Sequence, residues 1–159
     1  MKTTLLIAAL TAALPVFAAP AFAADELNVA PGLSYAGAPV GLHGADPVAV
    51  VNGDVITGEG EFSSVLNGAA YYFATAENKA EFDANPTAFE PQNGGFCTYG
   101  VSVGKKFDGD PRHAVVHEGK LYVFLNAKTR ELFLEDVAGA LTNATQNWAK
   151  IEHVAATDL

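Results

Sequence analysis

The sequence predicts an α+β fold, in which a small antiparallel sheet carries short helices on one side and helices close the C-terminal end. The dipeptides Asn67-Gly68 and Glu118-Gly119 each separate two apolar runs, which is typical of β-hairpins. A helix is expected over 76–84, because Thr75 can cap its start and Glu77 places a negative charge in its first turn. These signals favour a mixed fold built from local hairpins and short helices.

The other elements follow in chain order. Asp46-Pro47 opens an expected strand, and the Asn52-Gly53 turn can return it antiparallel. Asn85-Pro86 ends the helix after the aromatic strand, and Gly139 is expected to break the C-terminal helical region in two. The expected elements are strands at 48–51, 55–56 and 69–73, the helix at 76–84, hairpin strands at 113–116 and 121–125, and helices at 129–137 and 141–151.

The first 23 residues have the pattern of a cleavable signal peptide. Lys2 provides a positive charge, residues 5–17 are almost entirely apolar, and Ala21-Phe22-Ala23 forms an A-x-A cleavage site. We therefore expect export to a bacterial periplasm and a mature chain that begins at Ala24. No later apolar run approaches the roughly 20 residues of a membrane-spanning helix, so no membrane insertion is expected after cleavage.

The mature chain is expected to form one domain. Residues 24–41 predict an extended N-terminal arm, residues 42–151 a compact domain, and residues 152–159 a C-terminal tail. Without Lys2 the chain keeps 8 basic and 18 acidic residues, a formal net charge of −10. This charge argues against binding to nucleic acid or to anionic membrane surfaces.

A glycine-rich stretch between residues 85 and 111 holds Cys97, the only cysteine. A single cysteine cannot form an intrachain disulfide, so in an oxidising compartment its thiol should be buried, bound to metal, reactive or paired between chains. The mature chain also lacks methionine, because the only one is Met1. A soft-metal site would therefore depend on Cys97 and the four histidines.

Motifs along the chain resemble those of the YHS domain family, and in particular its stand-alone exported bacterial members. They are His43-Gly44-x-Asp46-Pro47-Val48, Asn67-Gly68-x-x-Tyr71-Tyr72-Phe73, Phe82-x-x-Asn85-Pro86-x-x-Phe89 and Gly94-Gly95-x-Cys97-x-Tyr99-Gly100. The resemblance covers about 42–151 and implies a small YHS or TRASH-like α+β domain associated with metal handling. Related domains bind metal through several cysteines, whereas this chain has Ala74 at one such position and no C-x-x-C.

Cys97 and His43 are the leading candidate metal ligands, because both lie in glycine-flanked loops and both match positions characteristic of the exported group. Thiolate and imidazole together suit copper, zinc or iron, in sites that use three or four ligands held by further hydrogen bonds. Asp46 and Tyr99 are candidates to support these ligands, although Asp46 can instead cap its own Asp-Pro turn.

His113 and His117 are further candidate ligands. Pro111 and the apolar run 114–116 favour a strand here, in which the two histidines would lie roughly 13 Å apart. They would then be too far apart to hold one ion together, but one of them could still join Cys97 and His43.

The expected function is the binding of a transition-metal ion, copper first and then zinc or iron, in periplasmic metal trafficking or tolerance. A metal-delivery or metal-receiving protein is the expected partner. The second hypothesis is a thiol enzyme, in which His43 activates Cys97 and the Gly94-Gly95 amides support an oxyanion. The third is a metal-free module that binds a protein or small ligand in an aromatic groove.

Overall fold

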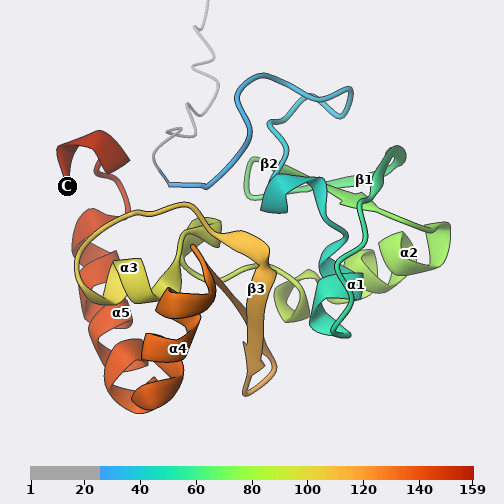
Figure 1. The fold of residues 1–159 in the computed structure, drawn as a ribbon. Helices are drawn as coiled ribbons and strands as arrows, with labels where there is room; N and C mark the ends of the chain where they lie inside the picture. Colours follow the sequence, from blue (N-terminus) through green and yellow to red (C-terminus); the bar gives the residue numbers. More distant parts are fainter. Residues whose placement is uncertain (1–25) are drawn as a thin grey trace, which may run out of the picture.

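The computed structural model describes residues 26–159, so the expected signal peptide lies outside the described residues. It confirms the α+β fold (Figure 1). The helices are α1 Pro47–Val51, α2 Ala76–Ala84, α3 Thr98–Ser102, α4 Ala127–Glu135 and α5 Val137–Ile151, and the strands are β1 Glu59–Leu66, β2 Ala69–Phe73, β3 Asp110–His117 and β4 Lys120–Phe124. Within residues 26–159, no helix is long and apolar enough to span a membrane.

The strands form two antiparallel hairpins, β1–β2 and β3–β4, that do not share a continuous sheet. The turns of the hairpins lie at Asn67-Gly68 and Glu118-Gly119, as the sequence predicts. On the second strand of each hairpin a short parallel bridge adds one residue of a preceding segment, Val40 beside Ala70 and Pro91 beside Leu121. The hairpins are therefore held by tertiary packing rather than by a shared sheet.

The expected strand at 48–51 is wrong, because these residues form helix α1. Asp46 caps the helix by accepting hydrogen bonds from the N–H groups of Val48 and Ala49 at 2.9 and 3.2 Å. Pro47 takes the first helical position, where its missing N–H group is not needed. The buried cap and the surrounding packing thus outweigh the preference of valine for strands.

Other expectations hold more closely. Strand β2 and helix α2 have the bounds that the sequence predicts, and Thr75 caps α2 through the N–H of Asn78 at 3.1 Å. The C-terminal helices divide at Asp136 rather than at Gly139. Asp136 accepts a hydrogen bond from the Gly139 N–H at 2.9 Å, so the expected breaker lies inside the first turn of α5.

The order of elements repeats with a constant offset of 51 residues. Helix α1, strands β1 and β2 and helix α2 begin at residues 47, 59, 69 and 76, and α3, β3, β4 and α4 begin at residues 98, 110, 120 and 127. The lengths are 5, 8, 5 and 9 residues in both sets. The strand register repeats too, since Glu59 pairs with Phe73 and Asp110 with Phe124. We call residues 41–89 the first repeat and residues 92–140 the second repeat.

The two repeats share little sequence. Only ten of the 49 aligned pairs are identical, and seven of these ten are glycines or aromatic residues. Two similar runs that begin Asp46-Pro47 and Asp110-Pro111 do not mark the repeat, because Asp46 corresponds to Cys97 and Asp110 to Glu59. Asp46 and Cys97 both directly precede a five-residue helix and accept a hydrogen bond from its first turn.

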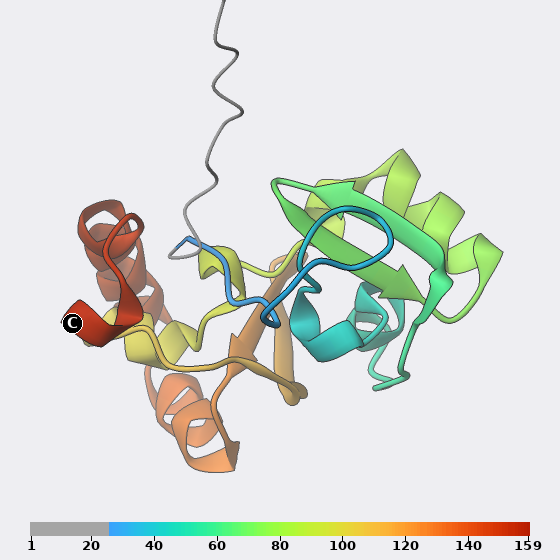
Figure 2. The same cartoon turned by 90° about the horizontal axis from the view of Figure 1, so that it is seen from above.

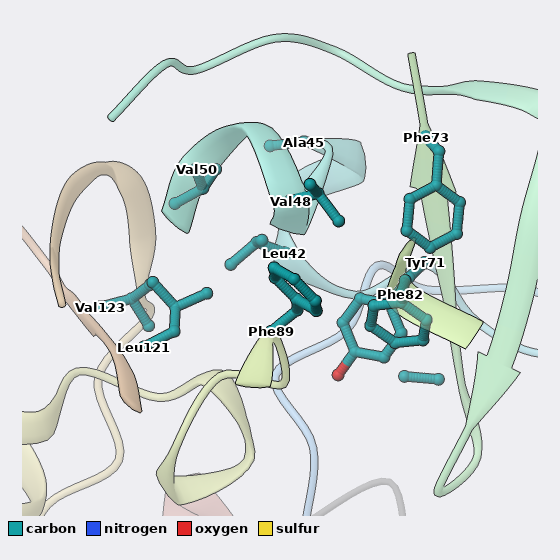
Figure 3. Close-up of a cluster of buried hydrophobic side chains, with 11 residues drawn as sticks. Leu42, Ala45, Val48, Val50, Tyr71, Phe73, Phe82, Phe89, Leu121 and Val123 are labelled. Atoms are coloured by element: carbon teal, nitrogen blue, oxygen red, sulfur yellow. The ribbon is translucent and has the colours of Figure 1, made fainter. Parts of the chain in front are cut away.

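Each repeat builds its own aromatic cluster. In the first repeat the ring of Phe82 lies 5.0 Å from that of Phe73, and in the second the ring of Phe133 lies 4.7 Å from that of Phe124. Two side chains of β4 complete the cluster of the first repeat, Leu121 and Val123 (Figure 3). The second hairpin is therefore part of both halves of the core.

The N-terminal arm passes over both repeats (Figure 2). The N–H of Asn28 donates to the carbonyl of Gly94, and the N–H of Ala30 donates to the carbonyl of Val40, both at 2.8 Å. These bonds anchor the arm to each repeat in turn and place the side chain of Asn28 between them.

Candidate functional site

The four predicted ligands, Cys97, His43, His113 and His117, do not form one metal site. Among residues 26–159, no three side chains of His, Cys, Asp or Glu are grouped so that they could hold an ion. Each of the four has different surroundings. Only His43 combines an exposed ring with a hydrogen-bonded carboxylate.

Cys97 is a core residue of the second repeat. Its side chain is fully shielded from solvent and packs with Tyr122, Phe124 and Phe133. The Sγ atom accepts a hydrogen bond from the Gly100 N–H at 3.4 Å, as the cap of α3. A thiol in such a setting packs as a small hydrophobe. Since a nucleophile must be reached by its substrate, this geometry gives the thiol-enzyme hypothesis no support.

Asp46 has the corresponding position in the first repeat. Its buried carboxylate accepts four hydrogen bonds, from the N–H groups of Val48, Ala49 and Ala74 and from Nδ2 of Asn78, at 2.9, 3.2, 2.8 and 2.7 Å. The carboxylate therefore ties α1 to the connection between β2 and α2. Of the two roles considered for Asp46, these bonds match the cap of the Asp-Pro turn.

The remaining predicted residues belong to the second repeat. Tyr99 lies in α3 and packs against the cluster around Cys97. His113 and His117 both lie on β3, as the strand prediction requires. The closest ionic partner of His117 is its neighbour Glu118, with Nε2 and Oε1 4.0 Å apart. These positions do not converge on His43 through any hydrogen bond in the described part of the chain.

His43 is held by a carboxylate of the second repeat. Its Nε2 lies 2.9 Å from Oδ1 of Asp108, and the two side chains are 46% and 53% exposed. The same oxygen accepts a hydrogen bond from Nδ2 of Asn28 at 2.7 Å, and Nδ2 also donates to the carbonyl of Gly95 at 2.9 Å. The cluster of Asn28, His43 and Asp108 thus joins the arm and both repeats at the surface.

The surroundings of Asp108 favour its ionised form. Burial raises the pKa of Asp108, but hydrogen bonds from Asn28 and His43 and the charge of His43 outweigh that effect and hold the pKa below its usual range. When Nε2 of a neutral imidazole donates to this carboxylate, the lone pair of the ring lies on Nδ1. A carboxylate partner also makes the free nitrogen more basic. The pair can therefore bind a metal ion or a proton at Nδ1.

His43 and Asp108 lie at the edge of a hollow of about 420 Å³. The other walls of the hollow come from the arm and from the start of the first repeat, and they are mostly apolar: Asn28, Val29, Ala30, Pro31 and Val40. Pockets that bind small molecules typically measure roughly 300–1,000 Å³. The space is therefore large enough for a small organic ligand.

The backbone at His43 is strained, and the second repeat provides an internal comparison. Leu42 and His43 have φ angles of 52° and 54°. Side chains with a Cβ rarely adopt this left-handed region, apart from Asn and Asp. In the second repeat the same left-handed turn consists of Asn93, Gly94 and Gly95, which tolerate it. Because such strain is often retained at functional sites, the imidazole at this position supports a functional role.

Glycine at position 43 is expected to be more stable than alanine by about 1 kcal/mol, because only the alanine side chain keeps the left-handed strain. Both variants lose the ring and its bond to Asp108, so the comparison isolates the backbone. At the exposed helical position Arg130 the order should reverse, with glycine less stable than alanine by about 1 kcal/mol. Urea unfolding of His43→Gly, His43→Ala, Arg130→Gly and Arg130→Ala measures the two differences. The same order at both positions would show that residue 43 is not strained.

Sequence reasoning missed Asp108 and Asn28. They are 65 and 15 residues away from His43, and neither lies in a pattern that predicts a ligand. The repeat, had it been visible, would have placed Asp108 one residue before a glycine shared with the first repeat, Gly109 for Gly58. No comparable signal exists for Asn28.

No family model, curated protein or solved structure matches this chain. The resemblance to the YHS family therefore stays a prediction from the motifs.

Proposed function

We propose that the chain is an exported protein that binds a transition-metal ion at Nδ1 of His43, with copper as the first candidate and zinc or iron next. The observation that carries the proposal is the ion pair of His43 with Asp108 at the edge of the hollow, with Nε2 engaged and Nδ1 left to a ligand. Carboxylate-oriented imidazoles of this kind are typical of metal-binding histidines.

The proposal does not require the thiol of Cys97. That side chain is fully buried, so metal coordination by its sulfur would require the aromatic cluster of the second repeat to open. A site with imidazole and carboxylate but no thiolate suits Cu(II) better than Cu(I), because Cu(I) prefers soft sulfur ligands. The strongly acidic chain also favours the approach of cations.

Trafficking or tolerance of periplasmic metal is the role that fits a site of this kind. A half-exposed imidazole with one carboxylate leaves most coordination positions of an ion to water or to another molecule. An ion held in this way can be passed on quickly, for instance to a metal-receiving protein. A signal peptide over residues 1–23 would deliver the chain to the compartment where such an exchange occurs.

Titration of the purified protein with Cu(II) tests the proposal. The variant His43→Ala should bind Cu(II) at least about tenfold more weakly, and Asp108→Asn should lose about tenfold, the low end of the range for partners that orient a ligand. His113→Ala is the matched control, because it removes an imidazole outside the cluster and should leave the affinity within about twofold. Calorimetry gives the affinities, and nitrogen couplings in the electron paramagnetic resonance spectrum identify an imidazole ligand.

The outcome for Cys97→Ser distinguishes the site proposed here from the one expected from the sequence. Unchanged Cu(II) affinity in this variant supports the His43–Asp108 site. Loss of binding in both Cys97→Ser and His43→Ala would restore the thiolate–imidazole site instead. Equal affinity of the wild-type protein and His43→Ala would contradict both.

A further inference from the structure

We infer that the ion reaches this site as a complex with a small organic chelator, rather than as a free hydrated ion. This inference rests on the proposed function and adds the chemical class of the cargo. Two features carry it: the small number of protein ligands at His43, and the size and apolar character of the hollow beside it.

The protein supplies too few ligands for a free ion. Transition metals in proteins usually have four or more ligands, and three of these normally come from the chain. In the described part of the chain His43 has one carboxylate nearby, Asp108, and no third His, Cys, Asp or Glu joins them. Since Nε2 of His43 is engaged by that carboxylate, the ring offers one nitrogen. A chelator that already fills several coordination positions would need only this one.

The hollow has room for the chelator. Its volume is about 420 Å³, whereas a water molecule occupies roughly 30 Å³ of liquid. A hydrated ion would leave much of this space filled by water lying against Val29, Pro31 and Val40. Burying the apolar face of a chelator against the same side chains releases that water, at roughly 25 cal/mol for each Å² removed from contact with it.

Charge restricts the class further. Asp108 stands at the edge of the hollow and is ionised, and the formal charge of the whole chain is −9. An anionic chelate, such as a metal carboxylate complex, would be repelled. The cargo that fits is therefore a cationic complex of a flat, largely apolar chelator with nitrogen donors and at least one open coordination position for Nδ1 of His43.

The 1:1 complex of Cu(II) with 2,2′-bipyridine is a suitable probe, because it is cationic, flat and coordinatively unsaturated. We expect it to bind the purified protein at least tenfold more tightly than free Cu(II), and free bipyridine to bind at least tenfold more weakly than the complex. Calorimetry measures the three affinities under one set of conditions. His43→Ala should weaken the binding of the complex at least tenfold.

A variant that fills the hollow separates this inference from the proposed function. Ala30 lines the hollow and is exposed, and its N–H is bonded to the chain at Val40, so Ala30→Phe should fold and occlude the space. It should reduce affinity for the complex at least fivefold while free Cu(II) keeps its affinity within twofold. Ala36→Phe is the matched control, since Ala36 is an exposed residue of the same arm that does not line the hollow.

The outcomes are distinguishable. Equal affinity for the complex and for free Cu(II), both lost in His43→Ala, would overturn the chelate inference and leave the proposed function standing. Binding of bipyridine alone as tightly as its copper complex would overturn the inference, because the metal would then contribute nothing. Failure of both forms of copper to bind would contradict the inference and the proposed function together.

Discussion

Replacing Asp46 with alanine is expected to destabilise the fold by about 3–5 kcal/mol. The buried carboxylate accepts four hydrogen bonds, and its removal leaves three backbone N–H groups and the amide of Asn78 without their acceptor. Each unsatisfied buried donor costs about 1–3 kcal/mol, and the four losses are not independent. Urea unfolding followed by circular dichroism measures the change in the free energy of unfolding.

The repeat offers the matched control at Cys97. This residue has the same place before a five-residue helix, but its sulfur accepts only one long hydrogen bond, from Gly100. Cys97→Ala should therefore cost about 1–2 kcal/mol, mostly for the lost packing of one sulfur atom. Asp46→Asn, which keeps one acceptor oxygen, should fall between the two alanine variants. Equal losses for Asp46→Ala and Cys97→Ala would show that the four hydrogen bonds of Asp46 contribute little.

The parts of the fold that the sequence predicts well are those decided by neighbours in the chain. Helix α2 and the hairpin turns follow from Thr75, Asn67-Gly68 and Glu118-Gly119, whose effects extend only over a few residues. Helix α1 was not predictable in this way. Its valines favour a strand, and the decisive carboxylate of Asp46 also bonds to Ala74 and Asn78, about 30 residues away.

The repeat was hidden because it is conserved in shape rather than in chemistry. Glycines keep the turns and aromatic rings keep the clusters, whereas the two helix caps are as different as Asp46 and Cys97. A resemblance between two Asp-Pro runs drew attention to another register. Only the common offset of the elements identifies the true one.

The candidate site was predictable in one residue only. His43 stands out from the sequence as an imidazole beside a glycine, but its carboxylate partner comes from the other repeat and its amide partner from the arm. Cys97 attracts attention for the opposite reason. A lone thiol is chemically suggestive, and nothing in its local sequence shows that three aromatic rings of distant elements enclose it.

Truncation of the central ring of either aromatic cluster is expected to cost about 3–5 kcal/mol, the usual range for buried phenylalanine. Phe82 is 1% exposed and Phe133 is fully buried. Phe82→Ala should have the larger effect, because Phe82 contacts three other rings and Phe133 contacts two. Leu134→Ala is the control, since this neighbour of Phe133 in α4 is 47% exposed and should change stability by less than about 0.5 kcal/mol.

Both phenylalanine variants are expected to unfold in a single transition, although each removes a ring from one repeat. The reason is that Leu121 and Val123 belong to β4 of the second repeat but pack in the cluster of the first, so neither repeat has a complete core of its own. Fluorescence of Trp148, the only tryptophan, reports on α5, and far-ultraviolet circular dichroism reports on the whole chain. Coincident midpoints by the two probes are the expected result. If Phe82→Ala melted the first repeat while the tryptophan signal stayed native, the repeats would be independent folding units, and the cluster shared through β4 would not couple them.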